Sequence, residues 1–429
     1  MCYNIFGNKI INNKKKNGGI KKMGKFISVS MLKPYAPSLV NRDDTGDAKQ
    51  IVVGGVTRAR ISSQCLKRAI RQEIGNRGIT TAHLEDLIEQ ILIDQCEAGN
   101  ISESDVDKIG KAVCCESILN CDWSKRTSQA KESKKKEDSN KGRTVNQVNM
   151  LEIDAVVNTA IKNKGMKQKD LEKEIKKSLE SIRVSADKSM FGTMATSGVI
   201  ESVDGAVQMA QTFSIDEYIP EDDFITAKFS TESVEDWDPF FGSYKKFESE
   251  NLAKPDAETL ANSCVHSNTM LSCTSVNIVE LKRNLSRSIV GTDINVDDVN
   301  HDVIKAICDY IETLITVEPS AKQNAMSSHS VPAVVYIEVI DNGAVKYPQG
   351  SFESVVRRRE DKSIVETGIE RIADFSADDT FRNGDIVKYF MLSSPYKKYS
   401  DSFRDSGCSE VSNLKELRNI LTESILSIL

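Results

Sequence analysis

Short segments with strand periodicity alternate with amphipathic helical segments, and this alternation limits the chain to a fold that mixes a sheet with helices. The first strand is predicted at 25–33, where Ile27, Val29 and Met31 recur with a period of two. The later predicted elements are strands at 269–281, 331–340 and 386–394, and helices at 301–317, at about 352–372 and from 413 onward. We therefore predict an α+β protein.

Two long polar stretches interrupt this alternation. The sheet-forming parts are expected at 23–77, 188–213 and 273–429, the last with a C-terminal helix. The insertions are a helical one at 78–187, which contains a mobile Lys-rich loop at 124–146, and an irregular one at 214–272. In residues 1–22 the basic residues follow the apolar stretch, so we expect a disordered leader rather than a secretory signal, with Met23 as a candidate start of translation.

The composition indicates a cytoplasmic protein without a metal site or a cofactor. No apolar run reaches the ~20 residues that a membrane-spanning helix needs. The 10 cysteines form no CxxC pair and the 4 histidines are scattered, so we expect reduced thiols and no metal cluster. The net charge is -6, yet segment 48–72 has no acidic residue and six lysines or arginines. In an acidic chain, such a segment indicates a selective anion site.

The acid-free segment contains a predicted helix that separates apolar from basic residues. An extended piece with a Gly-Gly break comes first, and the helix follows from Ser62 or Ser63 to a stop at Gly75. The apolar face consists of Leu66, Ala69, Ile70 and Ile74. The opposite face, at positions i, i+3, i+4 and i+7, consists of Gln64, Lys67, Arg68 and Arg71. From the residues alone, exposed helix charges and phosphate-binding groups are both open interpretations.

Three sequence blocks occur in order between Met23 and about Glu338. The first is Asn-Arg-Asp-Asp at 41–44, Gly-Gly at 54–55 and Arg-Ile-Ser-Ser-Gln-Cys-Leu-Lys-Arg at 60–68. The second is Gly-Thr-Met-Ala-Thr-Ser-Gly at 192–198 with Val-Asp-Gly-Ala at 203–206, and the third is Ala-Lys-Gln at 321–323. Together these blocks resemble the CasC family, the backbone subunit of type I-E CRISPR Cascade complexes. The chain departs from that family at 264–281, where it returns from the second insertion.

The resemblance implies an RRM-like (ferredoxin-like) palm with a large helical fingers insertion and an irregular thumb insertion. It also implies a role in CRISPR-Cas antiviral defence. The protein would bind CRISPR RNA regardless of sequence and polymerise as the backbone of a Cascade ribonucleoprotein that presents the guide to target DNA. The implied partners are CRISPR RNA, further copies of the chain, target DNA paired with the guide, and the repeat-processing, guide-5′-end, large and small Cascade subunits.

A subunit that accepts every guide must bind phosphates and sugars and leave the base edges free. The resemblance assigns RNA contacts to Arg42, Lys49, Ser62, Gln64, Lys67 and Arg71, and less directly to Arg58, Arg60, Arg68 and Lys322. It assigns the apolar wedges that space the bases to Met194, Phe224 and Ile225, because stacking tolerates any sequence. The alternatives are a core role for these apolar residues and a plain surface role for Lys322.

Catalysis is the main competing interpretation. Asp43 and Asp44 are adjacent carboxylates in the first block, and related type III backbone subunits cut bound target RNA with a loop aspartate. Adjacent side chains of extended chain point apart, and the sequence shows no P-loop, nucleophile elbow or Cys/His dyad, so we expect no enzyme activity. A target-cutting type III-like subunit is the second hypothesis, and a protein filament without RNA is the third.

Overall fold

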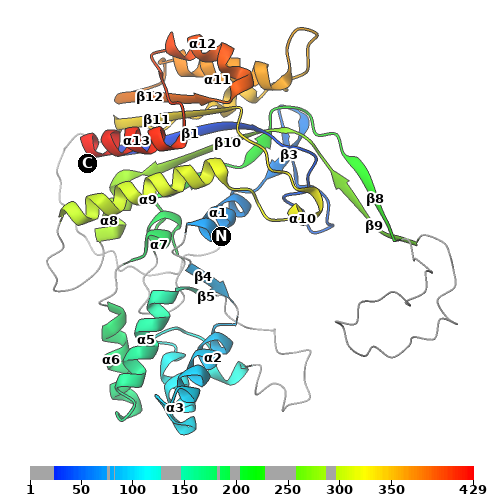
Figure 1. The fold of residues 1–429 in the computed structure, drawn as a ribbon. Helices are drawn as coiled ribbons and strands as arrows, with labels where there is room; N and C mark the ends of the chain where they lie inside the picture. Colours follow the sequence, from blue (N-terminus) through cyan, green and yellow to red (C-terminus); the bar gives the residue numbers. More distant parts are fainter. Residues whose placement is uncertain are drawn as a thin grey trace, which may run out of the picture.

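A computed structural model describes residues 24–74, 78–81, 83–126, 146–180, 184–193, 203–227, 258–286 and 296–429. The predicted leader, Met23 and most of the predicted loop at 124–146 lie outside these ranges. The described chain forms a large sheet with helices on both faces, a helical unit beside it and a two-stranded ribbon (Figure 1). The predicted mixture of sheet and helices is confirmed. No described helix is long and apolar enough to cross a bilayer.

The large sheet has nine strands, and all its pairs are antiparallel except β12 with β13. Its strands are β1 (Gly24–Pro34), β2 (Gln50–Val53), β3 (Val56–Ile61), β6 (Val207–Met209), β7 (Thr212–Ser214), β10 (Thr269–Asn277), β11 (Val334–Gly343), β12 (Asp385–Leu392) and β13 (Ser409–Glu410). In space they follow the order β13-β12-β11-β1-β10-β7-β3-β2, and β6 also pairs with β10. The predicted first strand therefore lies in the middle of the sheet.

The side chains of β1 alternate between two apolar cores, because successive residues of a strand point to opposite faces. Ile27, Val29 and Met31 belong to the first core, as predicted, and Leu32 belongs to the second. The first core is closed by α1 (Ser63–Glu73), α7 (Ala186–Phe191), α8 (Ile278–Ser286), α9 (Val296–Thr316) and α13 (Leu414–Ile428). The second core is closed by η4 (Pro348–Phe352), α11 (Ile364–Ala377), η5 (Ser394–Tyr399) and α12 (Ser400–Arg404). Both faces of the sheet are covered.

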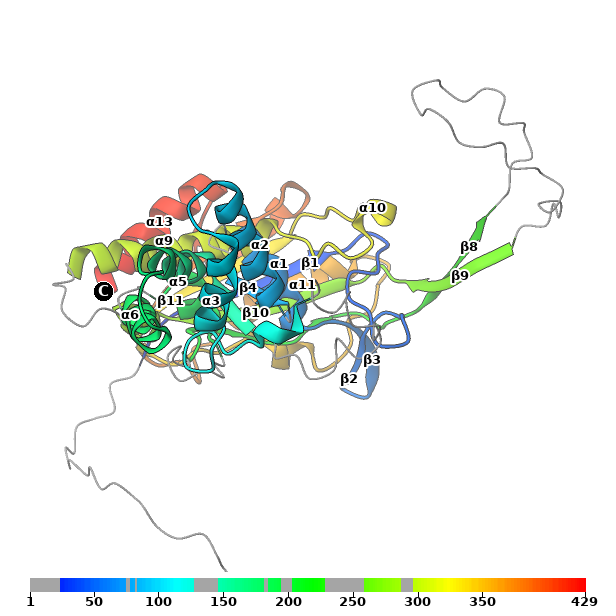
Figure 2. The same cartoon turned by 90° about the horizontal axis from the view of Figure 1, so that it is seen from below.

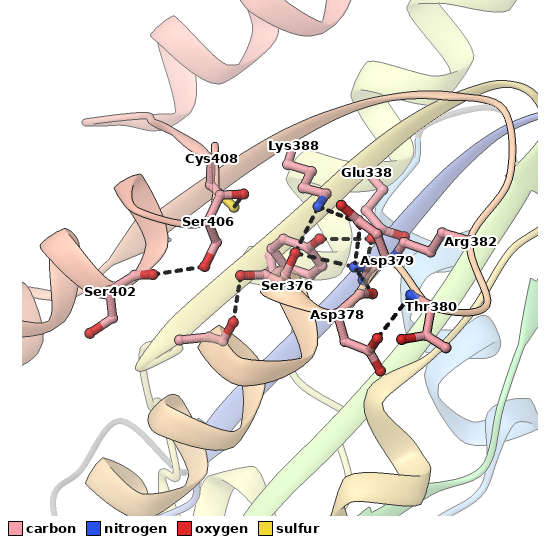
Figure 3. A network of polar contacts seen from close by, with 12 residues as sticks. Glu338, Ser376, Asp378, Asp379, Thr380, Arg382, Lys388, Ser402, Ser406 and Cys408 are labelled. Carbon is pink, nitrogen blue, oxygen red and sulfur yellow. Dashed lines mark hydrogen bonds and ion pairs between the residues drawn. The ribbon is translucent and has the colours of Figure 1, made fainter.

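Buried charges fix the connection between α11 and β12 on the second face (Figure 3). Glu338 projects from β11 and is 1% exposed; its carboxylate pairs with Arg382 at 2.7 Å and accepts a hydrogen bond from the Tyr336 hydroxyl at 2.7 Å. Lys388 of β12 pairs with Asp379 at 2.9 Å. Burial raises the pKa of Glu338, and the Arg382 charge opposes that rise. The turn that carries Asp379 and Arg382 is thus anchored to the sheet.

Residues 84–126 and 146–180 form a helical unit with an apolar core of its own. Its helices are α2 (Leu84–Glu97), α3 (Glu103–Val113), α5 (Met150–Lys162) and α6 (Gln168–Glu180), and the hairpin of β4 (Gly78–Thr81) and β5 (Asn146–Asn149) lies beside them (Figure 1). Trp123, in the short turn η1 (Trp123–Lys125), packs over Gly110, where a Cβ atom would lie 2.1 Å from the indole ring. The helices predicted in this insertion are present.

The described part of the second insertion contains a two-stranded ribbon, which was not among the predicted elements. β8 (Glu221–Ala227) pairs antiparallel with β9 (Glu258–Val265), and the register shifts after Ile225. The ribbon projects away from the sheet in both views (Figures 1 and 2). Cross-strand hydrogen bonds can satisfy the backbone of a polar segment without any apolar periodicity, so the composition alone did not reveal these strands. Residues 228–257 lie outside the described residues.

Two predicted element boundaries differ from the structure. The strand predicted at 269–281 ends at Asn277, whose side chain accepts a hydrogen bond from the Glu280 N–H (3.1 Å) and so starts α8. The helix predicted at about 352–372 is η4 followed by α11, which begins only after Ser363, because Ser363 and Glu366 form a capping box there. The helix predicted from Asn413 is confirmed as α13.

Candidate functional site

Helix α1 begins where the sequence predicts. The Ser62 side chain accepts a hydrogen bond from the Cys65 N–H (3.2 Å), and the Ser62 N–H donates to Asn41 Oδ1 (2.8 Å). Ser62 is buried and its hydroxyl serves the cap, and its predicted contact with RNA stays a prediction. Three residues of the predicted apolar face are buried, namely Leu66, Ala69 and Ile70. The first turn carries no acidic side chain, so no carboxylate there offsets the partial positive charge of the helix N-terminus.

Arg58 has a structural role in this fold, and its predicted contact with RNA stays a prediction. The residue is 0% exposed. Its Nη1 donates to the carbonyl oxygens of Ser214 (2.9 Å) and Ile215 (2.7 Å), and its Nη2 donates to those of Phe352 (3.4 Å) and Glu353 (3.2 Å). Burial is the main cause that lowers the pKa of Arg58. The guanidinium is thus occupied by carbonyl oxygens and is not open to solvent in this fold.

Arg71 and Lys67 are held by protein atoms on the side of α1 that faces α7 and β6. The Arg71 guanidinium binds both oxygens of Asp187, at 2.7 and 2.6 Å, and Asp187 is itself buried. Lys67 Nζ donates to the Val207 carbonyl oxygen (3.4 Å); burial, and then the Arg71 charge, lower the pKa of Lys67. The predicted row of four donors is therefore divided, because two of them pack against neighbouring elements.

The remaining predicted cations gather around the start of α1. The Lys49 N–H donates to the Asn41 carbonyl oxygen (3.0 Å) and the Arg60 N–H donates to the Lys49 carbonyl oxygen (2.8 Å), so loop 41–49 lies against β3. Burial raises the pKa of the Cys65 thiol, and the charges of Lys49 and Arg68 oppose the rise. We call this set the α1 basic surface: Arg42, Lys49, Arg60, Gln64 and Arg68. Within it, the side chains of Arg42, Gln64 and Arg68 are exposed.

Asp43 braces the loop that carries Arg42. Its Oδ1 accepts hydrogen bonds from the Thr45 hydroxyl (2.7 Å), the Thr45 N–H (3.0 Å) and the Asp47 N–H (3.0 Å). These bonds, led by that of the hydroxyl, lower the pKa of Asp43. Asp44 is exposed beside it. The described residues contain no group of three His, Cys, Asp or Glu side chains placed to hold a metal ion.

Two of the three predicted wedge residues belong to the described part of the chain. Met194 lies outside the described residues. Phe224 and Ile225 lie on β8, opposite Asn262 and Ala261 of β9, so both belong to the projecting ribbon. The motif that contains Met194 opens with Gly192 at a φ of 78°, where a Cβ atom would lie 2.8 Å from the Val203 carbonyl oxygen. Glycine is required there because two chain segments approach closely.

Lys322 lies at the start of a short helix that packs near α1. It is half-buried, has a left-handed backbone (φ 57°) and precedes α10 (Gln323–Met326). Met326 packs against the small core that also contains Leu66 of α1.

Three residues that hold the site together were not identified from the sequence. Asn41 ties the loop to the helix cap, Asp187 anchors Arg71, and Gln211 accepts a hydrogen bond from Arg60 Nε (3.1 Å) and donates one to Ser63 Oγ (3.2 Å). Asn41 had a signal, since it opens the first sequence block. Asp187 and Gln211 lie 116 and 151 residues from their partners, and local periodicity carries no information on such pairs.

The family model of the CT1975-like proteins, Cas_CT1975, matches residues 27–418. The chain belongs to this family. The match covers the sheet, the helical unit, the ribbon and the α1 basic surface, and it ends within α13. Among curated proteins no sequence match was found.

Two solved structures share this fold over nearly the whole chain. One, described as "CRISPR RNA-guided surveillance complex, pre-nicking", contains a chain with a TM-score of 0.68 and 17% identity, and the alignment covers 94% of this CT1975-like protein and 100% of that chain. Another, described as "CRISPR RNA-guided surveillance complex", gives a TM-score of 0.60 and 14% identity over 93% and 99% of the two chains. At these identities the likeness establishes a common fold, and the narrower type I-E CasC assignment stays a prediction.

Proposed function

We propose that this CT1975-like protein is an RNA-holding, non-catalytic backbone subunit of a CRISPR RNA-guided surveillance complex of the Cascade type. The observation that carries the proposal is the α1 basic surface, where loop 41–49, β3 and the acid-free start of α1 meet. The two chains that share its fold come from complexes described as CRISPR RNA-guided, and this supports the same setting here.

The chemistry of this surface suits a strand whose sequence varies. Arginine and lysine neutralise phosphates, the Gln64 amide can donate to sugars or phosphates, and none of these groups selects a base when it contacts the backbone. If four cations each meet one phosphate, the logarithm of the affinity should fall with the logarithm of salt concentration at a slope of roughly -3. The bases then remain free to pair with a target.

The strand order supports the RRM-like palm. β1 and β6 flank β10 and pair antiparallel with it, so they run parallel to each other and are joined through α1 and α7. β10 and β11 flank β1 in the same way and are joined through α8 and α9. Two βαβ connections, each split by an intervening strand, are the ferredoxin-like arrangement. Because η4 and α11 cover the face of the sheet that is turned away from α1, we propose that RNA follows α1 rather than lying across that face.

The proposed partners are CRISPR RNA, neighbouring copies of the chain, the remaining Cascade subunits and, through the guide, target DNA, all in the cytoplasm. The β8–β9 ribbon projects from the sheet (Figure 2), which suits a thumb that reaches the RNA of the next copy. We propose that Phe224 or Ile225 on this ribbon, or Met194, separates the bases there.

Removal of exposed cations tests the proposal. Arg42→Ala/Arg68→Ala should strip most of the RNA that co-purifies with the tagged complex and lower the salt slope of RNA binding by roughly 1.4, because two phosphate contacts are lost. The matched control is Lys173→Ala/Lys176→Ala, which removes the same charge from the exposed side of α6. RNA sequencing and the ratio of absorbance at two wavelengths measure the outcome. Equal RNA retention in both variants would refute the proposal and favour a protein filament.

Target cleavage by Asp43 or Asp44 is the competing hypothesis. The bonds that Asp43 makes within its own loop supply a structural reason for its presence in the first block. A guide-loaded assembly incubated with complementary RNA and Mg²⁺ should leave that RNA intact. Regularly spaced cuts that disappear in Asp43→Asn or Asp44→Asn would establish the enzyme instead.

A further inference from the structure

A second cationic feature lies away from the α1 basic surface, between the β2–β3 turn and the start of α11. It is a cavity of about 420 Å³. Three of its lining residues are arginines, namely Arg357, Arg359 and Arg371, and the others described at its wall are Gly54, Val56, Ser354, Val355, Val356 and Thr367. None of these residues is acidic, although the whole chain has a net charge of -6.

Arg371 is fixed at the wall of this cavity. Its Nη1 donates to the carbonyl oxygens of Ser351 (2.9 Å) and Ser354 (2.8 Å), and its guanidinium lies 5.7 Å from the centre of the Phe352 ring. Among the described residues, its hydrogen bonds involve Nη1 alone. A guanidinium held in this way keeps donors available at a small cost in side-chain entropy.

A second guanidinium, that of Arg58, binds the same backbone segment at residues 351–354. The carbonyl oxygens of Phe352 and Glu353 accept hydrogen bonds from Arg58, so Arg58 and Arg371 together bind four successive carbonyl groups. Burial is the main cause that lowers the pKa of Arg58 and the Arg371 charge adds to it, whereas the charges of Asp216, Glu217 and Glu353 oppose it. Of the two guanidinium groups, Arg371 is the one at the wall of the cavity, where an anion could meet it.

Arg357 and Arg359 supply exposed donors beside Arg371. Together with Arg358 they form three consecutive exposed arginines, and no ion pair involving them occurs in the described part of the chain. Glu360 and Asp361 follow at the tip of a turn, and neither acid lines the cavity. The Arg359 N–H closes this turn by donating a hydrogen bond to the Lys362 carbonyl oxygen (3.0 Å). Guanidinium groups match the geometry of phosphate oxygens bidentately.

We propose that this arginine cavity is a second nucleic-acid contact, which binds the phosphodiester backbone of an RNA or DNA strand. Strand β3 joins the two sites: Val56 is at the cavity, and Arg60, four residues along the strand, is on the α1 basic surface. Four residues of extended chain span roughly 13 Å, within reach of one bound strand. The preference for nucleic acid over an acidic peptide rests on the proposed function.

The test uses the purified full chain after high salt has removed its RNA. Fluorescence anisotropy measures its affinity for three 20-nucleotide probes, namely single-stranded RNA, single-stranded DNA and duplex DNA. Arg357→Ala/Arg359→Ala should weaken binding of at least one probe about tenfold and lower its salt slope by roughly 1.4 on a single strand or about 1.8 on duplex DNA, because two phosphate contacts are lost. The matched control is Lys346→Ala/Lys415→Ala, which removes two exposed charges elsewhere and should change affinity less than twofold. The probe that is affected identifies the strand.

Three outcomes are decisive. Equal affinity of the arginine and control variants for every probe overturns the inference. Loss of poly-glutamate binding with unchanged nucleic-acid binding also overturns it, in favour of an acidic peptide. If Arg42→Ala/Arg68→Ala binds all probes normally while Arg357→Ala/Arg359→Ala does not, the proposed RNA surface fails and the arginine cavity stands. Arg357→Lys/Arg359→Lys should recover only part of the affinity, since lysine lacks the bidentate fork.

Discussion

Arg71 binds both carboxylate oxygens of Asp187, with Nε–Oδ1 and Nη2–Oδ2 distances of 2.7 and 2.6 Å. The pair joins α1 to α7, and the Arg71 guanidinium also lies 5.6 Å from the centre of the Phe191 ring. It fixes the helix whose exposed side carries Gln64 and Arg68. The position of the α1 basic surface thus depends on a residue more than 100 positions away in the sequence.

Asp187→Ala should lower the free energy of unfolding by roughly 2 kcal/mol, because it leaves Arg71 partly buried without its partner. Urea denaturation monitored by circular dichroism measures the change. Asp154→Ala, at an exposed position of α5, should have an effect below about 0.5 kcal/mol. If the two variants unfold at the same urea concentration, the pair does not fix α1.

Arg58→Met should destabilise the fold by roughly 3 kcal/mol, since four backbone carbonyl groups lose their donor in a buried site. Arg58→Lys should recover little of this loss, because one ammonium cannot reach both pairs of carbonyl groups. Thermal unfolding gives the comparison, with the exposed Arg68→Met as the control. A melting temperature for Arg58→Met equal to that of the control would contradict the structural role.

The two glycines of the β2–β3 turn should differ in their tolerance of alanine. Both have positive φ, 58° at Gly54 and 76° at Gly55, so each substitution carries a conformational cost of about 1 kcal/mol. At Gly54 the added Cβ would lie 2.1 Å from the Glu353 carbonyl oxygen, whereas at Gly55 it meets nothing within 4 Å. Gly54→Ala should therefore cost at least 1 kcal/mol more than Gly55→Ala in denaturation experiments. Equal costs would show that residue 353 does not approach the turn.

The buried Glu338 should make stability depend on pH. Burial raises its pKa in the folded state above the unfolded value of about 4.5, so the folded protein binds more protons between the two values and its stability falls as pH rises through that interval. Glu338→Gln removes this contribution. The difference in unfolding free energy, wild type minus Glu338→Gln, should thus decrease from pH 4.5 upward. A difference that grows with pH would mean that Arg382 lowers the pKa of Glu338 more than burial raises it.

The sequence predicted elements well wherever a local pattern determined them. β1, α9, α13 and the cap of α1 follow from periodicity and from side chains within four residues of one another. The ribbon β8–β9 lacks such a pattern, and its strands pair across residues 228–257. The same distinction applies to the site. The concentration of cations was visible, but the burial of Arg58 depends on carbonyl groups up to 295 residues away, which no local pattern encodes.

The helical unit at 84–126 and 146–180 keeps its apolar core separate from the two cores of the sheet. Substitutions inside that unit can therefore change its stability while the pairing of β1 with β10 and β11 stays intact. A fluorescent protein or an affinity tag inserted among the helices of the unit is a practical way to label the assembly without disturbing the proposed path of the guide.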